Sequence, residues 1–183
     1  MKKLAVNFYG LLIRYSILIL SALFNLGLFY FIFTPLTVYP VYFIISLFFE
    51  AVLMGNVIFI EQSIPIELIK SCIAGSAYYL LFVLNMSVPN IAPKKRIKMV
   101  LLSFLSLLVL NILRIVILVF VFMFGTSFFD ATHKIFWYAL STVFVVGIWF
   151  AEVKIFRIKE IPIYSDIKNL IDSIHKPKRS KKN

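Results

Sequence analysis

Apolar residues run along most of the chain in long blocks that short polar or charged segments separate. Four blocks reach the length of about 20 residues that a helix needs to cross a hydrocarbon core about 30 Å thick. They cover residues 8–33, 68–87, 98–124 and 134–153. A fifth block, residues 37–55, is also apolar but contains Pro40 and Glu50. This pattern predicts an all-α integral membrane protein with about four transmembrane helices.

The composition agrees with this pattern. Of the 183 residues 62% are hydrophobic, and the mean hydropathy is +0.98, whereas a soluble domain is nearer half apolar. One domain is expected at this length. The N-terminal block is too long for the apolar part of a signal peptide, and no small-residue cleavage pattern follows it.

The basic residues determine the predicted orientation. A net charge of +11 would suggest nucleic acid as a partner of a soluble protein. Here the cations gather at the ends of apolar blocks, so membrane topology explains them and no nucleic-acid partner is expected. Three lie near the start, four in the loop 92–98 and nine after Phe150. Because cytoplasmic loops carry the excess of Lys and Arg, both termini and this loop are predicted to be cytoplasmic.

The number of crossings then determines the role of the fifth block. The helix over 68–87 must run inward to the basic loop, so residues 57–67 are expected outside as a short extended hairpin around Pro65. Only one crossing fits before this hairpin, and the first block supplies it. Residues 37–55 are therefore predicted to be a re-entrant or interfacial outer helix. The alternative is a fifth span with the N-terminus outside.

Residues 1–157 are predicted to form the membrane-embedded core, and residues 158–183 a cytoplasmic basic tail. Within the tail, "YSDIKNLIDSIHK" predicts a short amphipathic helix on the membrane surface, capped by Ser165. The final residues, "KPKRSKKN", are expected to be attracted to anionic lipid.

Three basic residues lie outside these cytoplasmic clusters: Lys70, Arg114 and Lys134. Arg114 lies inside an apolar block, where a charge is costly and usually functional. Its position sixteen residues after Lys98 corresponds to about 24 Å along a helix, in the outer part of the bilayer. Asn111 shares its helix face and is expected to hold the guanidinium. The alternative is an arginine that snorkels to the membrane surface.

The only cysteine, Cys72, and His133 are predicted to lie at the same outer depth as Arg114. A single cysteine in an apolar helix is ordinarily a small apolar residue, and His133 alone is typical of an interfacial histidine near Trp137. Together, however, the three side chains suit acyl transfer. A thiolate attacks a carbonyl, a histidine transfers protons, and an arginine stabilises the oxyanion.

The order of these residues resembles the exosortase and archaeosortase family. The matching segments are "CIAG" at 72–75, "LNILRI" at 110–115 after the basic loop, and then His133. The similarity covers roughly residues 35–153 and is nearest to the short archaeal members. The chain departs from the longer exosortases, which have "CSG" and additional N-terminal helices.

The resemblance implies a membrane-embedded cysteine transpeptidase or protease whose active site faces outside. Its substrates would be exported proteins that end in a sorting motif, a transmembrane helix and a basic tail. The enzyme would cut near the motif and pass the new C-terminus to a membrane lipid. Carried over to this chain, Cys72 is the nucleophile, Arg114 stabilises the transition state and His133 is the general acid/base.

Four residues are expected to support this trio: Asn111, Glu67, Lys70 and Lys134. The positive charge of the two lysines would favour a thiolate, although interfacial lysines that bind lipid headgroups are the simpler interpretation. Glu67 is expected to pair with Lys70 at a three-residue spacing. A single cysteine allows no intramolecular disulfide and no multi-cysteine metal site, and the chain has no HExxH motif or glycine-rich phosphate loop. No metal or cofactor is therefore predicted.

Two other functions stay open on the sequence. A non-enzymatic membrane protein, such as a small transporter subunit or an assembly factor, would use Asn111 and Arg114 as a structural polar pair. An intramembrane protease would use the same trio with water as the acceptor. The sorting motif, the acceptor and the oligomeric state are not specified by the sequence.

Overall fold

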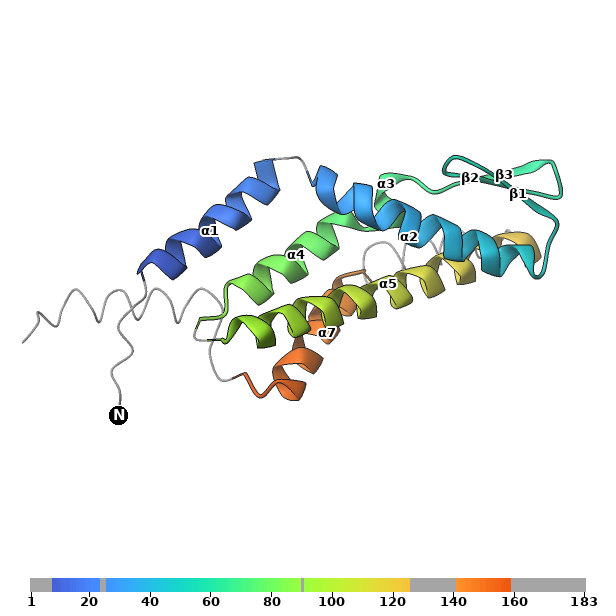
Figure 1. Cartoon of the computed structure of the whole chain (residues 1–183). Coiled ribbons are helices and arrows are strands. Elements are labelled where there is room, and N and C mark those ends of the chain that lie inside the picture. The colour runs from blue at the N-terminus through green and yellow to red at the C-terminus, as the bar shows by residue number, and fades with distance from the viewer. Residues whose placement is uncertain (1–7, 24–25, 90, 126–140, 159–183) are drawn as a thin grey trace, which may run out of the picture.

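The computed structural model describes residues 8–23, 26–89, 91–125 and 141–158. These segments form a helical bundle with a small sheet at one end (Figure 1). In chain order the elements are α1 (Phe8–Leu23), α2 (Gly27–Ser46), β1 (Ala51–Met54), β2 (Val57–Ile60), β3 (Ile64–Glu67), α3 (Lys70–Ile73), α4 (Gly75–Met86), α5 (Pro93–Phe124) and α7 (Ser141–Ile155).

The first predicted span, residues 8–33, is two helices rather than one. α1 ends at Leu23 and α2 begins at Gly27. Between them, Leu26 has a left-handed backbone with φ 57° and ψ 12°. A right-handed helix cannot continue through such a residue, so the apolar block is divided although its hydrophobicity is continuous.

The prediction of a separate helix over residues 37–55 is wrong in its limits. α2 runs without interruption through Pro35 and Pro40 to Ser46, and the rest of the block contains β1. A proline removes one backbone hydrogen bond, but packed neighbours allow a membrane helix to tolerate this loss. α2 has such neighbours, because it packs against α4 and α5.

Among the described residues, two helices, α2 and α5, are long and apolar enough to cross a membrane. Four spans are not shown there. α4 has 12 residues, fewer than the ~20 of a full crossing. α1 and α7 have 16 and 15 described residues, and residues 134–140 of the last predicted span lie outside the described part of the chain. The chain is therefore mostly helical with a small sheet, and its two long apolar helices indicate membrane association.

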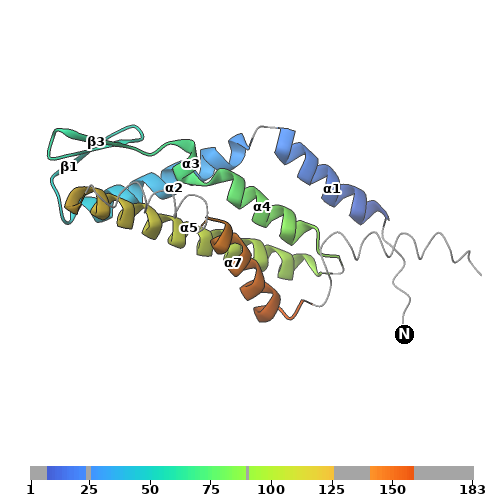
Figure 2. The ribbon, with the colours of Figure 1, turned by 180° about the vertical axis from the view of Figure 1, so that it is seen from behind.

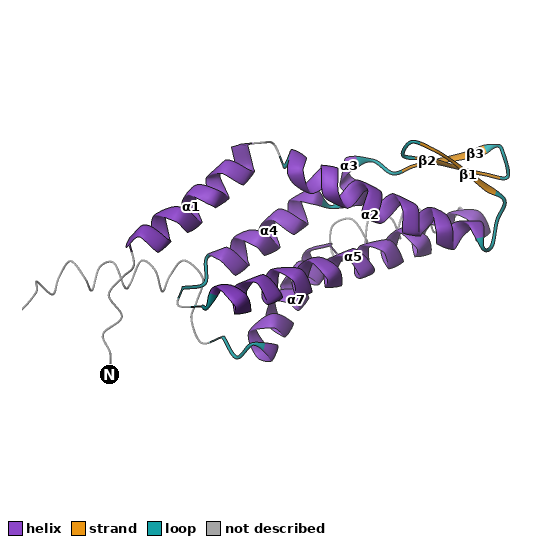
Figure 3. Ribbon diagram, viewed as in Figure 1, coloured by secondary structure: helices purple, strands orange, loops and turns teal. Residues whose placement is uncertain are grey.

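The predicted extended segment at 57–67 belongs to a three-stranded antiparallel sheet with the order β1-β2-β3. Ala51 pairs with Ile60 in the first ladder, and Val57 pairs with Glu67 in the second. Gly55, at φ 62°, begins the two-residue turn between β1 and β2, as glycine-first hairpin turns require. Figure 3 shows that the strands occupy only one end of the molecule.

Aromatic side chains join the central helices. The ring of Phe33 in α2 stacks on Tyr78 in α4 at a centroid distance of 3.6 Å. Phe104 in α5 meets both rings edge-on, at 5.4 and 5.7 Å. On its other side α5 packs against α7, which is seen in front of it in Figure 2. α5 is therefore the element on which α2, α4 and α7 converge.

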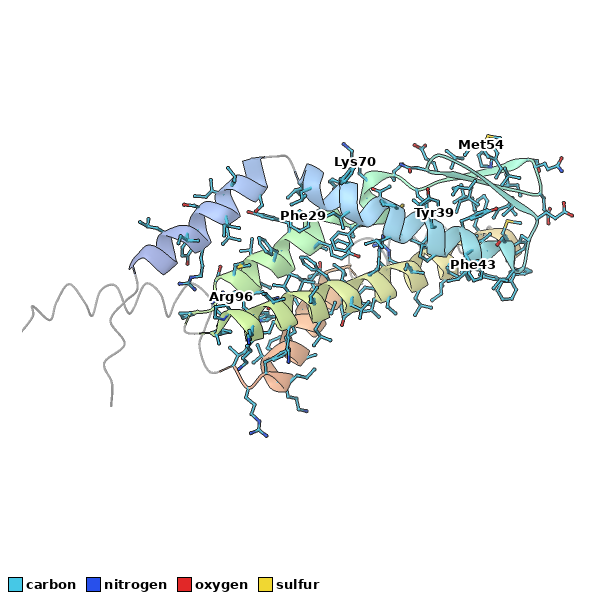
Figure 4. The ribbon with its side chains drawn as sticks, viewed as in Figure 1. Phe29, Tyr39, Phe43, Met54, Lys70 and Arg96 are labelled. Carbon is cyan, nitrogen blue, oxygen red and sulfur yellow. The ribbon has the colours of Figure 1, made fainter. Side chains whose placement is uncertain are left out.

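The two ends of the bundle differ in charge. Arg14 of α1 and Arg96 of α5 both donate hydrogen bonds to the carbonyl of Met86, at the end of α4. Lys95 Nζ donates to the carbonyl of Phe156, just after α7, at 2.7 Å. These bonds bring three basic segments to one end, where Figure 4 labels Arg96. The sheet lies at the other end with three acidic residues: Glu50, Glu61 and Glu67.

Candidate functional site around Cys72

A break between two helices lies directly after Cys72. α3 ends at Ile73, and Ala74 has a left-handed backbone with φ 59° and ψ 37° before α4 begins at Gly75. A Cβ atom on Gly75 would lie 2.7 Å from the ring of Tyr30, so any larger residue here would require the ring to shift. The segment "CIAG" is therefore one helical turn, a left-handed residue and a tight helix contact.

Two side chains of α5 reach the carbonyls that this break leaves at the end of α3. Asn111 Nδ2 donates to the Cys72 carbonyl at 2.8 Å. Arg114 Nη2 donates to the carbonyls of Ser71 and Cys72, each at 3.4 Å. The last carbonyls of a helix have no donors within the helix, and within a bilayer an unsatisfied carbonyl is costly. The polar pair therefore satisfies the backbone of α3.

Burial decides between the two interpretations of Arg114. The side chains of Asn111 and Arg114 are only 2% and 6% exposed, so both face the interior of the bundle. The alternative of a snorkelling arginine at a lipid-facing surface is therefore wrong. Both side chains turn toward the backbone around Cys72.

Cys72 lies beside these donors with a free, partly buried thiol. Its backbone N–H donates to the carbonyl of Ile69 at 2.8 Å, which holds the short α3 turn. The charge of Arg114 acts on the thiol, and that of Glu67 acts on it to a smaller degree. The fold thus brings together the only thiol and the guanidinium that the sequence placed at one depth.

Of the other predicted site residues, the structure describes Glu67 and Lys70. Lys70 Nζ lies 5.7 Å from the centroid of the Tyr30 ring, a cation–π contact, and Figure 4 shows Lys70 beside α3. The expected pair between Glu67 and Lys70 relied on helical spacing. It does not apply, because Glu67 ends β3 whereas Lys70 begins α3. His133 and Lys134 lie outside the described residues.

A second buried polar cluster was not predicted. Asn85 Nδ2 of α4 donates to Glu152 Oε2 of α7 at 3.1 Å and to Ser103 Oγ of α5 at 3.2 Å. All three side chains are at most 1% exposed. The sequence did contain one indication of this cluster, the single carboxylate within the block 134–153. An acidic residue in a membrane span seldom faces lipid, so a buried partner could have been expected. Three helices meet at this cluster.

Neither cluster resembles a metal centre: in the part of the chain that the structure describes, no three His, Cys, Asp or Glu side chains gather. No protein-family model, curated protein or solved structure matches this chain. The chemistry of the site is therefore interpreted from its own residues.

Proposed function

We propose that this protein is a membrane-embedded cysteine transpeptidase that cleaves the C-terminal sorting signals of exported proteins. The observation that supports this most is the contact of α5 with α3, where Arg114 Nη2 lies 3.4 Å from the carbonyl oxygen of Cys72. It puts a guanidinium beside the only thiol of the chain, and acyl transfer uses such a pair. The similarity of the residue order to the exosortase and archaeosortase family supports the same chemistry.

The proposed reaction has two steps. The Cys72 thiolate adds to the scissile carbonyl, and Arg114 stabilises the resulting oxyanion. As the intermediate collapses, the C–N bond breaks, the leaving amine takes a proton from His133 and a thioester remains. A nucleophilic group of a membrane lipid then attacks the thioester and gives its proton to His133, and the C–S bond breaks to release the Cys72 thiolate. Water in place of the lipid would give hydrolysis.

The proposed orientation puts the basic end of the bundle in the cytoplasm, in agreement with the rule for basic loops. Both termini are then cytoplasmic, and the chain crosses the membrane several times. The sheet and the Cys72 region lie toward the outer face, where an exported substrate arrives. The basic tail of the substrate would stay on the cytoplasmic side, so that its own membrane helix fixes the depth of the scissile bond.

The test uses the full-length protein expressed together with a tagged exported protein that ends in a sorting motif, a transmembrane helix and a basic tail. Cys72→Ala is expected to abolish processing. The matched control is Ser71→Ala, which changes the neighbouring α3 side chain but keeps its carbonyl, and it is expected to process normally. Processing by Cys72→Ala at the wild-type rate would show that the proposed mechanism is wrong.

Two mass measurements refine this test. A hydroxylamine-sensitive mass increase on Cys72 identifies the thioester, because thioesters react with hydroxylamine and amides do not. The mass of the processed substrate separates lipid transfer from hydrolysis.

Arg114→Lys is expected to keep the fold but to slow processing, since an ammonium lacks the planar, multidentate geometry of a guanidinium.

A non-enzymatic membrane protein is the second candidate. It is favoured by the finding that Asn111 and Arg114 both donate to backbone carbonyls of α3, as a structural pair would. A structural role needs only the Cys72 carbonyl, which Cys72→Ala keeps, whereas Asn111→Leu removes its donor. This candidate predicts that Asn111→Leu lowers the unfolding temperature while Cys72→Ala changes neither stability nor cellular function. The transpeptidase predicts loss of function in Cys72→Ala with unchanged stability.

A further inference from the structure

An open cavity of about 470 Å³ lies between the start of α5 and the end of α7. Four of the seven residues that line it are cations, and none is acidic. The cations are Lys94, Lys95, Lys98 and Arg157, and the other lining residues are Ala92, Ile155 and Phe156.

The walls of this cavity are tied to each other. Lys95 Nζ on α5 donates to the Phe156 carbonyl beyond α7 at 2.7 Å. This lysine therefore already has a partner within the protein and connects the two walls of the cavity. Arg157 has a left-handed backbone with φ 48°, and its N–H donates to the carbonyl of Lys154 at 3.3 Å. This bend ends α7 and sets Arg157 in the cavity wall. Within the described ranges, Lys94, Lys98 and Arg157 form no ion pair with a carboxylate.

The cations converge at a point where the backbone is also positive. The N-terminus of a helix carries partial positive charge, which ordinarily favours acidic residues in the first turn. The first turn of α5 has no acidic residue and no side-chain cap, and three lysines of this helix line the cavity instead. An anion in the cavity would offset both the repulsion among the cations and the dipole of α5.

The cavity lies where charged sequence gives way to apolar sequence on both helices. After Lys98, the only charged residue of α5 is Arg114, and α7 has none before Glu152. In a helix that crosses a membrane, this boundary lies at the depth of the lipid headgroups. Ile155, at 63% exposure, and Phe156 add an apolar side. Such a side suits the glycerol and acyl parts of a lipid.

We infer that this cavity binds the phosphate of an anionic phospholipid headgroup. Lys98 and Arg157, from the two walls, contact the phosphate oxygens, and Lys94 adds charge at the rim. Basic pockets between membrane helices recognise phospholipid headgroups in this way. The inference is independent of the proposed catalysis, since Lys98 and Asn111 are roughly 20 Å apart along α5.

The experiment measures phosphatidylglycerol binding to the full-length protein in nanodiscs, with phosphatidylcholine as the comparison lipid. Lys98→Gln and Arg157→Gln are each expected to weaken phosphatidylglycerol binding about fivefold. A basic residue near an anionic membrane surface contributes about 1 kcal/mol, and a loss of that size lowers the affinity about fivefold. Lys154→Gln is the matched control. It removes the same charge three residues before Arg157 but does not line the cavity, and it is expected to change binding less than about twofold. Circular dichroism verifies that each variant is folded, and Lys98→Arg is expected to retain binding.

Equal losses in all three glutamine variants would mean that a diffuse basic surface attracts the lipid, and would overturn the inference. Equal affinity for phosphatidylcholine would also overturn it. Competition by inorganic phosphate at millimolar concentration then distinguishes a phospholipid headgroup from a free phosphate ion as the ligand of the cavity. Failure to compete, with the variant pattern intact, supports a headgroup presented by a lipid. Full displacement by inorganic phosphate would assign the cavity to a soluble anion instead.

Discussion

At the scale of single residues, Glu152 has the most demanding environment among the described acidic side chains. Its side chain is 1% exposed, and it accepts a hydrogen bond from Asn85 at a point where three helices meet. A carboxyl in such a place is costly to bury unless its neighbours donate to it. Since Asn85 also donates to Ser103 of α5, the cluster joins α4, α5 and α7.

Glu152→Gln is expected to retain near wild-type stability, because the amide oxygen still accepts from Asn85 and the volume is nearly unchanged. Glu152→Ala removes the acceptor and leaves a void, and is expected to lower the free energy of unfolding by about 2–3 kcal/mol. Denaturation of the purified protein in mixed micelles measures both. Val146→Ala, at a position of α7 that is 45% exposed, is the control. Equal losses in the Gln and Ala variants would contradict this role.

That Arg114 lies near Cys72 was predictable, but the bonding between them was not. A constant rise per residue put Arg114 and Cys72 at the same level of their helices, and the contact of Arg114 with the backbone of Cys72 agrees with that shared level. The partner of Asn111 depends on the left-handed backbone of Ala74. Hydrophobic periodicity carries no information about such a residue, because an alanine there looks like any other helical alanine. The catalytic roles stay predictions.

At the scale of elements, the α3–α4 junction depends on the size of one residue. Gly75 approaches the Tyr30 ring so closely that an added Cβ would lie 2.7 Å from the ring atoms Cε1 and Cζ. A side chain at this position would therefore displace the Tyr30 ring from the start of α4.

Gly75→Ala is expected to destabilise the protein by about 1–3 kcal/mol through overpacking. In a Tyr30→Leu background the same substitution is expected to cost much less, because the shorter side chain lacks those ring atoms. Thermal unfolding of the four proteins gives the coupling between the two positions. Gly147→Ala in α7, where a Cβ meets nothing within 4 Å, is the control and is expected to be neutral or stabilising. Additive effects of Gly75→Ala and Tyr30→Leu would contradict this interpretation.

Helix limits were the least predictable part of the fold. The apolar blocks led correctly to helices because few other structures satisfy the backbone in lipid. The division between α1 and α2 was missed since it depends on the backbone of Leu26, in the sequence "NLG". β1 was missed because its apolar residues continue an apolar block, although the Gly55–Asn56 turn signal follows directly.

At the scale of the whole molecule, the separation of charge is the feature that carries most information. Hydrogen bonds from Arg14, Lys95 and Arg96 join three segments that are far apart in sequence. The grouping of basic segments at one end was predicted from loop charges alone. This grouping could be predicted because it depends on composition at helix ends, not on the limits of any helix.

The proposed orientation predicts opposite labelling of the two ends. In a Cys72→Ala background, a cysteine introduced as Gln62→Cys, in the exposed turn between β2 and β3, is expected to react with a membrane-impermeant maleimide on intact cells. Lys154→Cys, at the basic end, is expected to react only after permeabilisation. Labelling of both positions from the same side would refute the orientation.

The length of α5 has a consequence for the bilayer itself. With 32 residues it extends about 48 Å, roughly 18 Å more than a typical hydrocarbon core. In the proposed orientation, with Lys98 at one boundary of such a core, Arg114 would lie about 6 Å below the other boundary and the last turns around Phe120 would project past it. Longer acyl chains would move that boundary outward and immerse the Cys72–Arg114 contact more deeply. Hydrophobic mismatch thus makes the exposure of this contact to water a property that the surrounding lipids adjust.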